Sequence, residues 1–131
     1  MTVQQIRVAL MNDGEPLAFL AGQLERAVPD IDLTQWPAAP AQEAEIAVCW
    51  KPPQGVLAAM PKLRLIHSIG AGVDALVSDP TLPALPVCRV VDPTLGTAMA
   101  EFVLWGALYF HRRFDEVVAN ARRGHWERFE Q

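Results

Sequence analysis

The sequence is poor in cysteine, and neither of its two cysteines stands in a metal-binding pattern. Cys49 and Cys88 have no second cysteine or histidine at metal-ligand spacing. Both lie in apolar runs that are typical of strands. We therefore expect buried free thiols and no metal site.

A long apolar run is also absent. About half of the 131 residues are apolar, but no run of them approaches the roughly 20 residues that a membrane span needs. The amino terminus, from Met1 to Arg7, lacks the basic segment and apolar stretch of a signal peptide. We expect a soluble globular protein that makes no membrane contact, with the cytoplasm as its compartment.

Concentrated positive charge is the third feature that the sequence lacks. The net charge is -4, and the basic residues are scattered except for Arg112-Arg113 and Arg122-Arg123. Nucleic-acid binding needs a basic patch, so we expect no nucleic-acid partner and expect both pairs to solvate helix faces. The length leaves room for one domain with a proper core and a long appended element.

Strand-length apolar runs alternate with stretches at helical spacing over the first 92 residues. This alternation predicts an α/β fold, with a flavodoxin-like parallel sheet of about five strands and flanking helices. The expected strands are residues 6–11, 31–33, 45–50, 63–69 and 87–91. The expected helical segments are residues 17–28, 56–60 and 73–77.

The pattern changes from about Pro93 or Thr97 onward. Residues between Met99 and Phe110 are apolar around most of a helix circumference, which predicts one long helix over residues 93–131. Such a helix is expected to be covered on several sides. We expect Asp92 to cap its start rather than to act in catalysis.

Ligands of open parallel sheets bind outside the carboxyl ends of the strands, where the connecting loops diverge. Residues 12–16, 50–53, 70–74 and 92–96 follow the expected strands there. The most informative segment is Gly70-Ala71-Gly72-Val73-Asp74, whose two glycines free the backbone to approach a small anion and turn N–H groups toward it. The same residues are equally typical of a tight turn whose glycines serve only backbone geometry.

This segment is not a dinucleotide fingerprint, because the third glycine and the acidic residue at the end of a following strand are missing. Trp50 and Lys51 offer an aromatic wall and a cation at the neighbouring strand end, which suits a small carboxylate-bearing substrate. The alternative is a tryptophan that caps the core and a lysine in solvent.

The three histidines are candidates for a general acid, but none has a recognisable pairing with a carboxylate. His67 lies inside an expected strand, His111 beside two arginines and His125 near the terminus. We expect structural roles for all three. The sequence contains no nucleophile and base constellation.

Four segments together resemble the amino-terminal, substrate-binding (catalytic) part of the D-isomer-specific 2-hydroxyacid dehydrogenases. They are residues 47–53, residues 63–74, residues 100–104 and Trp126. Among these enzymes the glyoxylate/hydroxypyruvate reductases are the most similar. The resemblance covers essentially the whole chain.

In that family, the strand that matches residues 63–69 is followed by a loop whose backbone N–H groups bind the substrate carboxylate. The resemblance implies that Ala71 and Gly72 are the donors, with Gly70 and Val73 beside them, and that Trp50 lines the pocket. It also implies a parent protein that reduces small 2-keto acids such as glyoxylate or hydroxypyruvate with NADP or NAD.

The resemblance equally implies what this chain does not contain. In the family the long helix leads into a Rossmann domain, which carries the cofactor site and a catalytic arginine, glutamate and histidine. We expect that domain to be absent here. The chain alone is therefore expected to have no catalytic residue, no bound cofactor and no activity, and to form a homodimer through the helix around Met99 to Phe110.

Two alternatives compete with this interpretation. A flavodoxin-like binding module is the first, but residues 12–16 offer neither the acidic pair of a phosphoacceptor receiver nor the phosphate loop of a flavodoxin. The second is a truncated regulatory paralogue that pairs with a full-length dehydrogenase. The sequence does not separate it from part of a longer enzyme.

Overall fold

The computed structural model describes residues 5–14 and 17–129 of the chain. The chain divides into two compact units, Met1–Val91 and Asp92–Gln131. No described helix is both long and apolar enough to cross a membrane.

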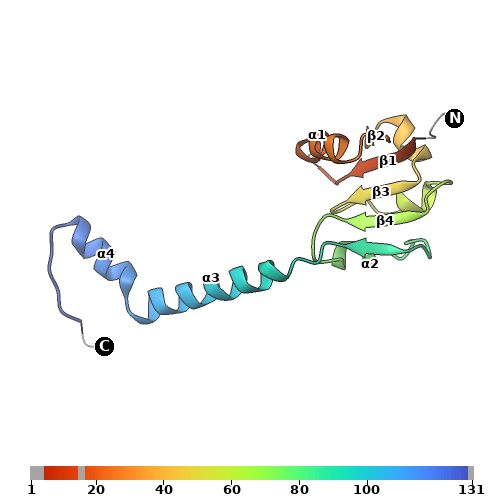
Figure 1. The fold of residues 1–131 in the computed structure, drawn as a ribbon. Helices are drawn as coiled ribbons and strands as arrows, with labels where there is room; N and C mark the ends of the chain where they lie inside the picture. Colours follow the sequence, from red (N-terminus) through yellow and green to blue (C-terminus); the bar gives the residue numbers. More distant parts are fainter. Residues whose placement is uncertain (1–4, 15–16, 130–131) are drawn as a thin grey trace. The chain divides into compact units, whose positions relative to one another are not determined.

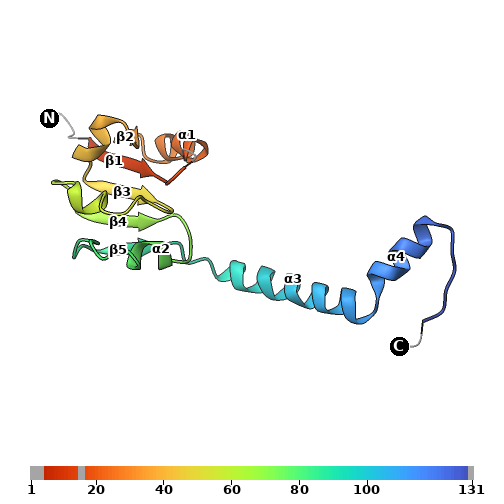
Figure 2. The ribbon, with the colours of Figure 1, turned by 180° about the vertical axis from the view of Figure 1, so that it is seen from behind.

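The first unit is built on one five-stranded sheet in the order β2-β1-β3-β4-β5, with every neighbouring pair parallel (Figures 1 and 2). The strands are β1 (Ile6–Met11), β2 (Ile31–Gln35), β3 (Ile46–Cys49), β4 (Leu65–Ser68) and β5 (Val87–Arg89). This is the strand order of flavodoxin-like folds. The predicted α/β class and sheet are therefore confirmed.

Helical segments connect the strands. They are α1 (Ala18–Ala27), the 3-10 turns η1 (Ala39–Glu43) and η2 (Leu57–Ala59), and α2 (Asp74–Val77). The helical segment expected over residues 56–60 is thus a single 3-10 turn. Of the turn expected over residues 12–16, residues 15 and 16 lie outside the described part of the chain.

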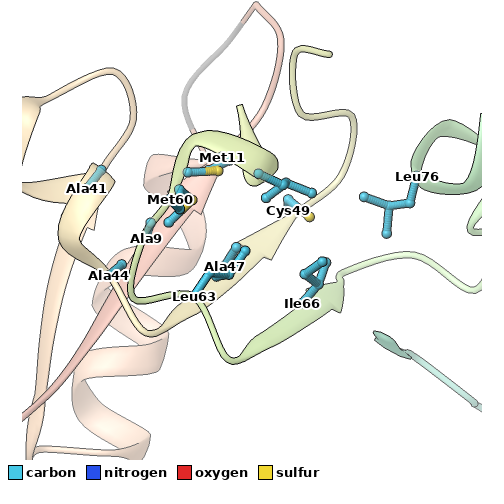
Figure 3. Packing of buried hydrophobic residues seen from close by; sticks show 11 residues of the cluster. Ala9, Met11, Ala41, Ala44, Ala47, Cys49, Met60, Leu63, Ile66 and Leu76 are labelled. Atoms are coloured by element: carbon cyan, nitrogen blue, oxygen red, sulfur yellow. The ribbon is translucent and has the colours of Figure 1, made fainter. Parts of the chain in front are cut away.

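Small side chains allow close packing on one face of the sheet. Ala9 of β1 and Ala47 of β3 belong to the same fully buried cluster as Ala41 and Ala44, at η1 and its end (Figure 3). Larger side chains complete this cluster, namely Met11, Cys49, Leu57, Met60, Leu63, Ile66 and Leu76. The core therefore lies between the sheet and the segments that follow β2, β3 and β4.

The second unit begins at a capped helix. Asp92 accepts hydrogen bonds from the Thr94 backbone N–H at 2.8 Å and from Thr94 Oγ1 at 2.7 Å. These bonds hold the pKa of Asp92 below its usual value. Helix α3 (Pro93–His111) follows directly, so the expected capping role is confirmed and the helix starts at Pro93 rather than Thr97.

A single helix over residues 93–131 is a wrong expectation. Arg113 adopts a left-handed conformation, with φ of 55°, and separates α3 from α4 (Phe114–Arg122). No glycine or proline marks this break. Arg113 forms an ion pair with Glu116 of α4. A non-helical segment follows α4, and its Glu127 Oε2 accepts a hydrogen bond from Asn120 Nδ2 of α4 at 3.0 Å. Residues 130 and 131 lie outside the described part.

The two cysteines have opposite environments, contrary to the expectation that both are buried. Cys49 is fully buried in the core of β3, and burial raises the pKa of its thiol to about 12. Cys88 is exposed. The reason is its position on β5, an edge strand whose three residues are all exposed.

We predict that N-ethylmaleimide modifies the folded chain at Cys88 and spares Cys49, because the thiolate is the reactive form and Cys49 is buried as a neutral thiol. Intact-mass spectrometry at neutral pH measures the modification over time. Cys88→Ser abolishes the fast reaction and Cys49→Ser preserves it. Equal rates at the two thiols would contradict the burial difference.

Candidate functional site

The candidate site lies at the carboxyl ends of β3, β4 and β5. Because the strands are parallel, these ends lie together at the same end of the sheet. Its centre is the segment from Gly70 to Asp74, here called the 70–74 loop, which joins β4 to α2. The structure brings this loop next to Trp50. The indole Nε1 lies 3.8 Å from the position that a Cβ atom on Gly70 would occupy.

Trp50 and Lys51 form one side of this end of the sheet. The Lys51 Nζ atom lies 5.4 Å from the centroid of the Trp50 ring. Trp50 is 52% exposed and does not belong to the buried cluster. In the described part of the chain its indole N–H has no hydrogen-bond acceptor, so this donor is available.

Ser68 organises the 70–74 loop from beneath. This buried residue is the last of β4, and its Oγ atom lies 3.2 Å from the Gly70 carbonyl oxygen and 3.1 Å from that of Gly72. The Gly70 N–H donates to the Ser68 Oγ atom at 3.2 Å. One hydroxyl thus faces the carbonyls of both glycines.

Strand β5 and the residue that follows it also contact the loop. The Val90 N–H donates to the Gly70 carbonyl at 3.3 Å. Arg89 Nη1 donates to the Ala71 carbonyl at 3.0 Å. Every carbonyl from Gly70 to Gly72 therefore has a donor within the chain.

These contacts determine where the amides point. In a trans peptide the carbonyl and the N–H of the following residue point in opposite directions. The N–H groups of Ala71, Gly72 and Val73 consequently point away from Ser68 and Arg89. Among the described residues, none of the three has a hydrogen-bond acceptor. The loop thus presents a row of unpaired donors, which suits an anion.

The glycines of the loop are not required by its backbone conformation. Positive φ angles occur among the described glycines at Gly14, Gly55 and Gly124, and not at Gly70 or Gly72. A Cβ on Gly70 would meet nothing closer than 3.8 Å, and one on Gly72 would lie 3.3 Å from Asp74 Oδ2. Neither glycine is therefore required for a left-handed backbone conformation, while the space at Gly72 is tight for a side chain.

The other candidate residues are dispersed. His67 lies half-buried on β4, with no hydrogen-bond partner for its buried Nδ1 in the described chain. His125 Nε2 lies 3.9 Å from Glu127 Oε2 in the second unit, a proximity that the sequence did not indicate. The described residues contain no group of three or more histidine, cysteine or acidic side chains that is able to hold a metal ion.

Sequence reasoning missed two residues that shape the loop, Ser68 and Arg89. A possible signal for Ser68 is its polarity at a strand position whose alternate neighbour, Ile66, is buried. For Arg89 no local signal exists. Sequence reasoning also missed Asp79. Its carboxylate accepts hydrogen bonds from Thr81 Oγ1 at 2.6 Å and from the backbone N–H of Gly55 at 3.0 Å and of Thr81 at 2.8 Å, and these bonds lower its pKa.

No family model matches the sequence. The chain is 33% identical over 122 residues to glyoxylate/hydroxypyruvate reductase A from Yersinia enterocolitica, a match that covers 88% of the chain and 39% of the relative. The chain also superposes on a D-isomer-specific 2-hydroxyacid dehydrogenase family protein from Klebsiella pneumoniae, with a TM-score of 0.80 and 31% identity. This match covers 100% of the chain and 42% of the Klebsiella protein. The resemblance to the D-isomer-specific 2-hydroxyacid dehydrogenases is confirmed.

A third similar structure is an NADPH-dependent glyoxylate/hydroxypyruvate reductase from Sinorhizobium meliloti in complex with NADP and sulfate. It has a TM-score of 0.74 and 28% identity, and the match covers 97% of the chain and 42% of that protein. The chain thus spans about two fifths of the length of these 2-hydroxyacid dehydrogenases.

The 70–74 loop does not fit a dinucleotide. In the 70–74 loop the two glycines lead into α2, which is only four residues long. A dinucleotide site needs a full helix N-terminus for the pyrophosphate. The loop suits a smaller anion.

We predict that Gly72→Ala changes the free energy of unfolding by less than about 1 kcal/mol, because alanine tolerates the backbone angles there. Gly55→Ala is the matched control, since its φ of +78° disfavours a side chain although its nearest neighbour is 3.9 Å away. It should cost roughly 1–2 kcal/mol. Urea denaturation of both variants measures the difference, and a larger loss at Gly72 would refute the prediction.

Proposed function

We propose that this chain is the substrate-binding portion of an NAD(P)-dependent D-2-hydroxyacid dehydrogenase that reduces small 2-keto acids such as glyoxylate or hydroxypyruvate. The 70–74 loop binds the substrate carboxylate. Ala71 and Gly72 donate their backbone N–H groups to it, with Gly70 and Val73 beside them. The observation that carries this proposal is the row of loop amides without acceptors in the described chain.

Charge and shape around the loop support a small carboxylate as the ligand. The Lys51 ammonium group and the Arg89 guanidinium lie at the same end of the sheet, and both favour an anion there. The exposed indole of Trp50 offers an apolar wall beside Gly70. The reductase activity of the Yersinia and Sinorhizobium relatives concerns ligands of this class.

The reaction itself belongs to the whole enzyme in this proposal. The chain spans 39% of the Yersinia relative, and its 70–74 loop does not fit the dinucleotide that the Sinorhizobium enzyme binds. We assign the cofactor site and the catalytic side chains to the remainder of the enzyme. The 131-residue chain alone is inactive on this assignment.

Glycolate titrated into the isotope-labelled chain should move the amide proton signals of Ala71 and Gly72 downfield, because new hydrogen bonds form there. We expect saturation with a dissociation constant of the order of 1 mM, as for a few hydrogen bonds at an open site. Amide NMR spectra provide the measurement. Glycolamide, which replaces the carboxylate by a neutral group of the same size, should produce no saturable shift.

Shifts centred elsewhere would contradict the assignment of the loop. The basic side chains at the opposite, amino-terminal end of the sheet offer a direct comparison, because Arg64 and Lys62 there are paired with Glu45 and Glu43. Saturable shifts at those residues, with none at the 70–74 loop, would show that glycolate binds to basic side chains in general and not to the loop amides.

We further propose that the chain forms a homodimer through α3 around Met99 to Phe110. No residue of α3 is buried, and its exposed large side chains lie on all sides. They are Leu95, Met99, Phe102, Val103, Leu104, Trp105, Leu108 and Phe110. Monomeric proteins seldom leave so large an apolar surface in water.

Phe102→Glu should weaken self-association at least about tenfold, because it places a charge within an apolar interface. Phe102 stacks on Trp105 with ring centroids 5.9 Å apart, so the substitution also removes an aromatic contact. Sedimentation equilibrium measures the association constant. Glu101→Gln on the same helix is the control and should leave it unchanged. A monomeric wild-type chain would rule out the dimer.

A further inference from the structure

We propose that Arg89 is a positioning residue that aims the Gly72 amide at the substrate carboxylate. This inference rests on the proposed function of the 70–74 loop. Arg89 acts through the Ala71 carbonyl, to which its Nη1 atom donates at 3.0 Å. Its role follows from the planarity of one peptide group.

The Ala71 carbonyl and the Gly72 N–H belong to the same peptide plane. A donor that holds the carbonyl oxygen therefore also determines the direction of the N–H, about 180° away. Arg89 holds the oxygen from the side of β5. The Gly72 N–H then points to the opposite side of the loop, where the described chain offers it no acceptor.

Arg89 is the single support of this peptide. The Gly70 carbonyl accepts from the Val90 N–H, and the single proton of the buried Ser68 hydroxyl is within reach of both the Gly70 and the Gly72 carbonyl. Within the described residues, the Ala71 carbonyl has Arg89 alone. The middle peptide of the loop thus depends on one exposed side chain from another strand.

The sheet places Arg89 for this task. Ser68 and Arg89 are register partners on β4 and β5, so their side chains leave the sheet on the same face and both reach the loop. A guanidinium forms strong, directional hydrogen bonds and keeps its charge at every physiological pH. No carboxylate of the described chain pairs with Arg89, so its positive charge remains available near the loop.

The test compares Arg89→Met, which removes the donor, with Arg89→Lys, which keeps a shorter one. Arg89→Met should shift the Ala71 carbonyl and Gly72 amide signals of the free chain and raise the glycolate dissociation constant about tenfold, as expected for loss of a charged hydrogen bond. Arg89→Lys should recover part of the affinity. Arg64→Met removes an equally exposed arginine, bonded to Glu45 at 3.2 Å, and should change neither signal nor affinity.

The outcomes separate position from charge and from the proposed function. If Arg89→Met weakens glycolate binding while the Gly72 amide signal of the free chain stays in place, Arg89 acts by charge alone and the inference is wrong. Unchanged affinity would also overturn it. If the wild-type chain itself shows no saturable shift at the 70–74 loop, the proposed function fails first, and this is visible before any variant is made.

Discussion

Parallel pairing of β4 with β3 and β5 is the constraint on which the candidate site depends. Cys49, Ser68 and Arg89 are register partners across the three strands. Trp50 therefore follows β3 at the level where the 70–74 loop leaves β4, and Arg89 ends β5 beside it. A shift of this register by one residue would turn Ser68 and Arg89 to the other face of the sheet and remove both from the loop.

Peptide geometry then determines how the 70–74 loop presents its amides. The chain satisfies the loop carbonyls with its own donors, while the amides of Ala71, Gly72 and Val73 have no acceptor among the described residues. Such a loop is organised before a ligand arrives, so binding does not require a rearrangement of the backbone. Gly70 and Gly72 themselves carry no side chain at the loop surface.

The two units use their apolar residues differently. In the first unit one cluster of apolar side chains is enclosed, and close alanine packing brings η1 onto the sheet. In the second, α3 is rich in large apolar side chains and none is buried. Composition alone does not distinguish these cases, since it records how many apolar residues exist and not whether the unit has a second layer to cover them.

The sequence by itself determined the strands, the parallel sheet, the cap at Asp92 and the position of the 70–74 loop, because each depends on the order of neighbouring residues. Only the tertiary structure decided that Cys88 is exposed on an edge strand, that α3 ends before Arg113, and that Arg89 meets Ala71 from 18 residues away. These features depend on which strands are neighbours and in what register. Local periodicity does not encode that choice, and the sheet makes it through long-range hydrogen bonds.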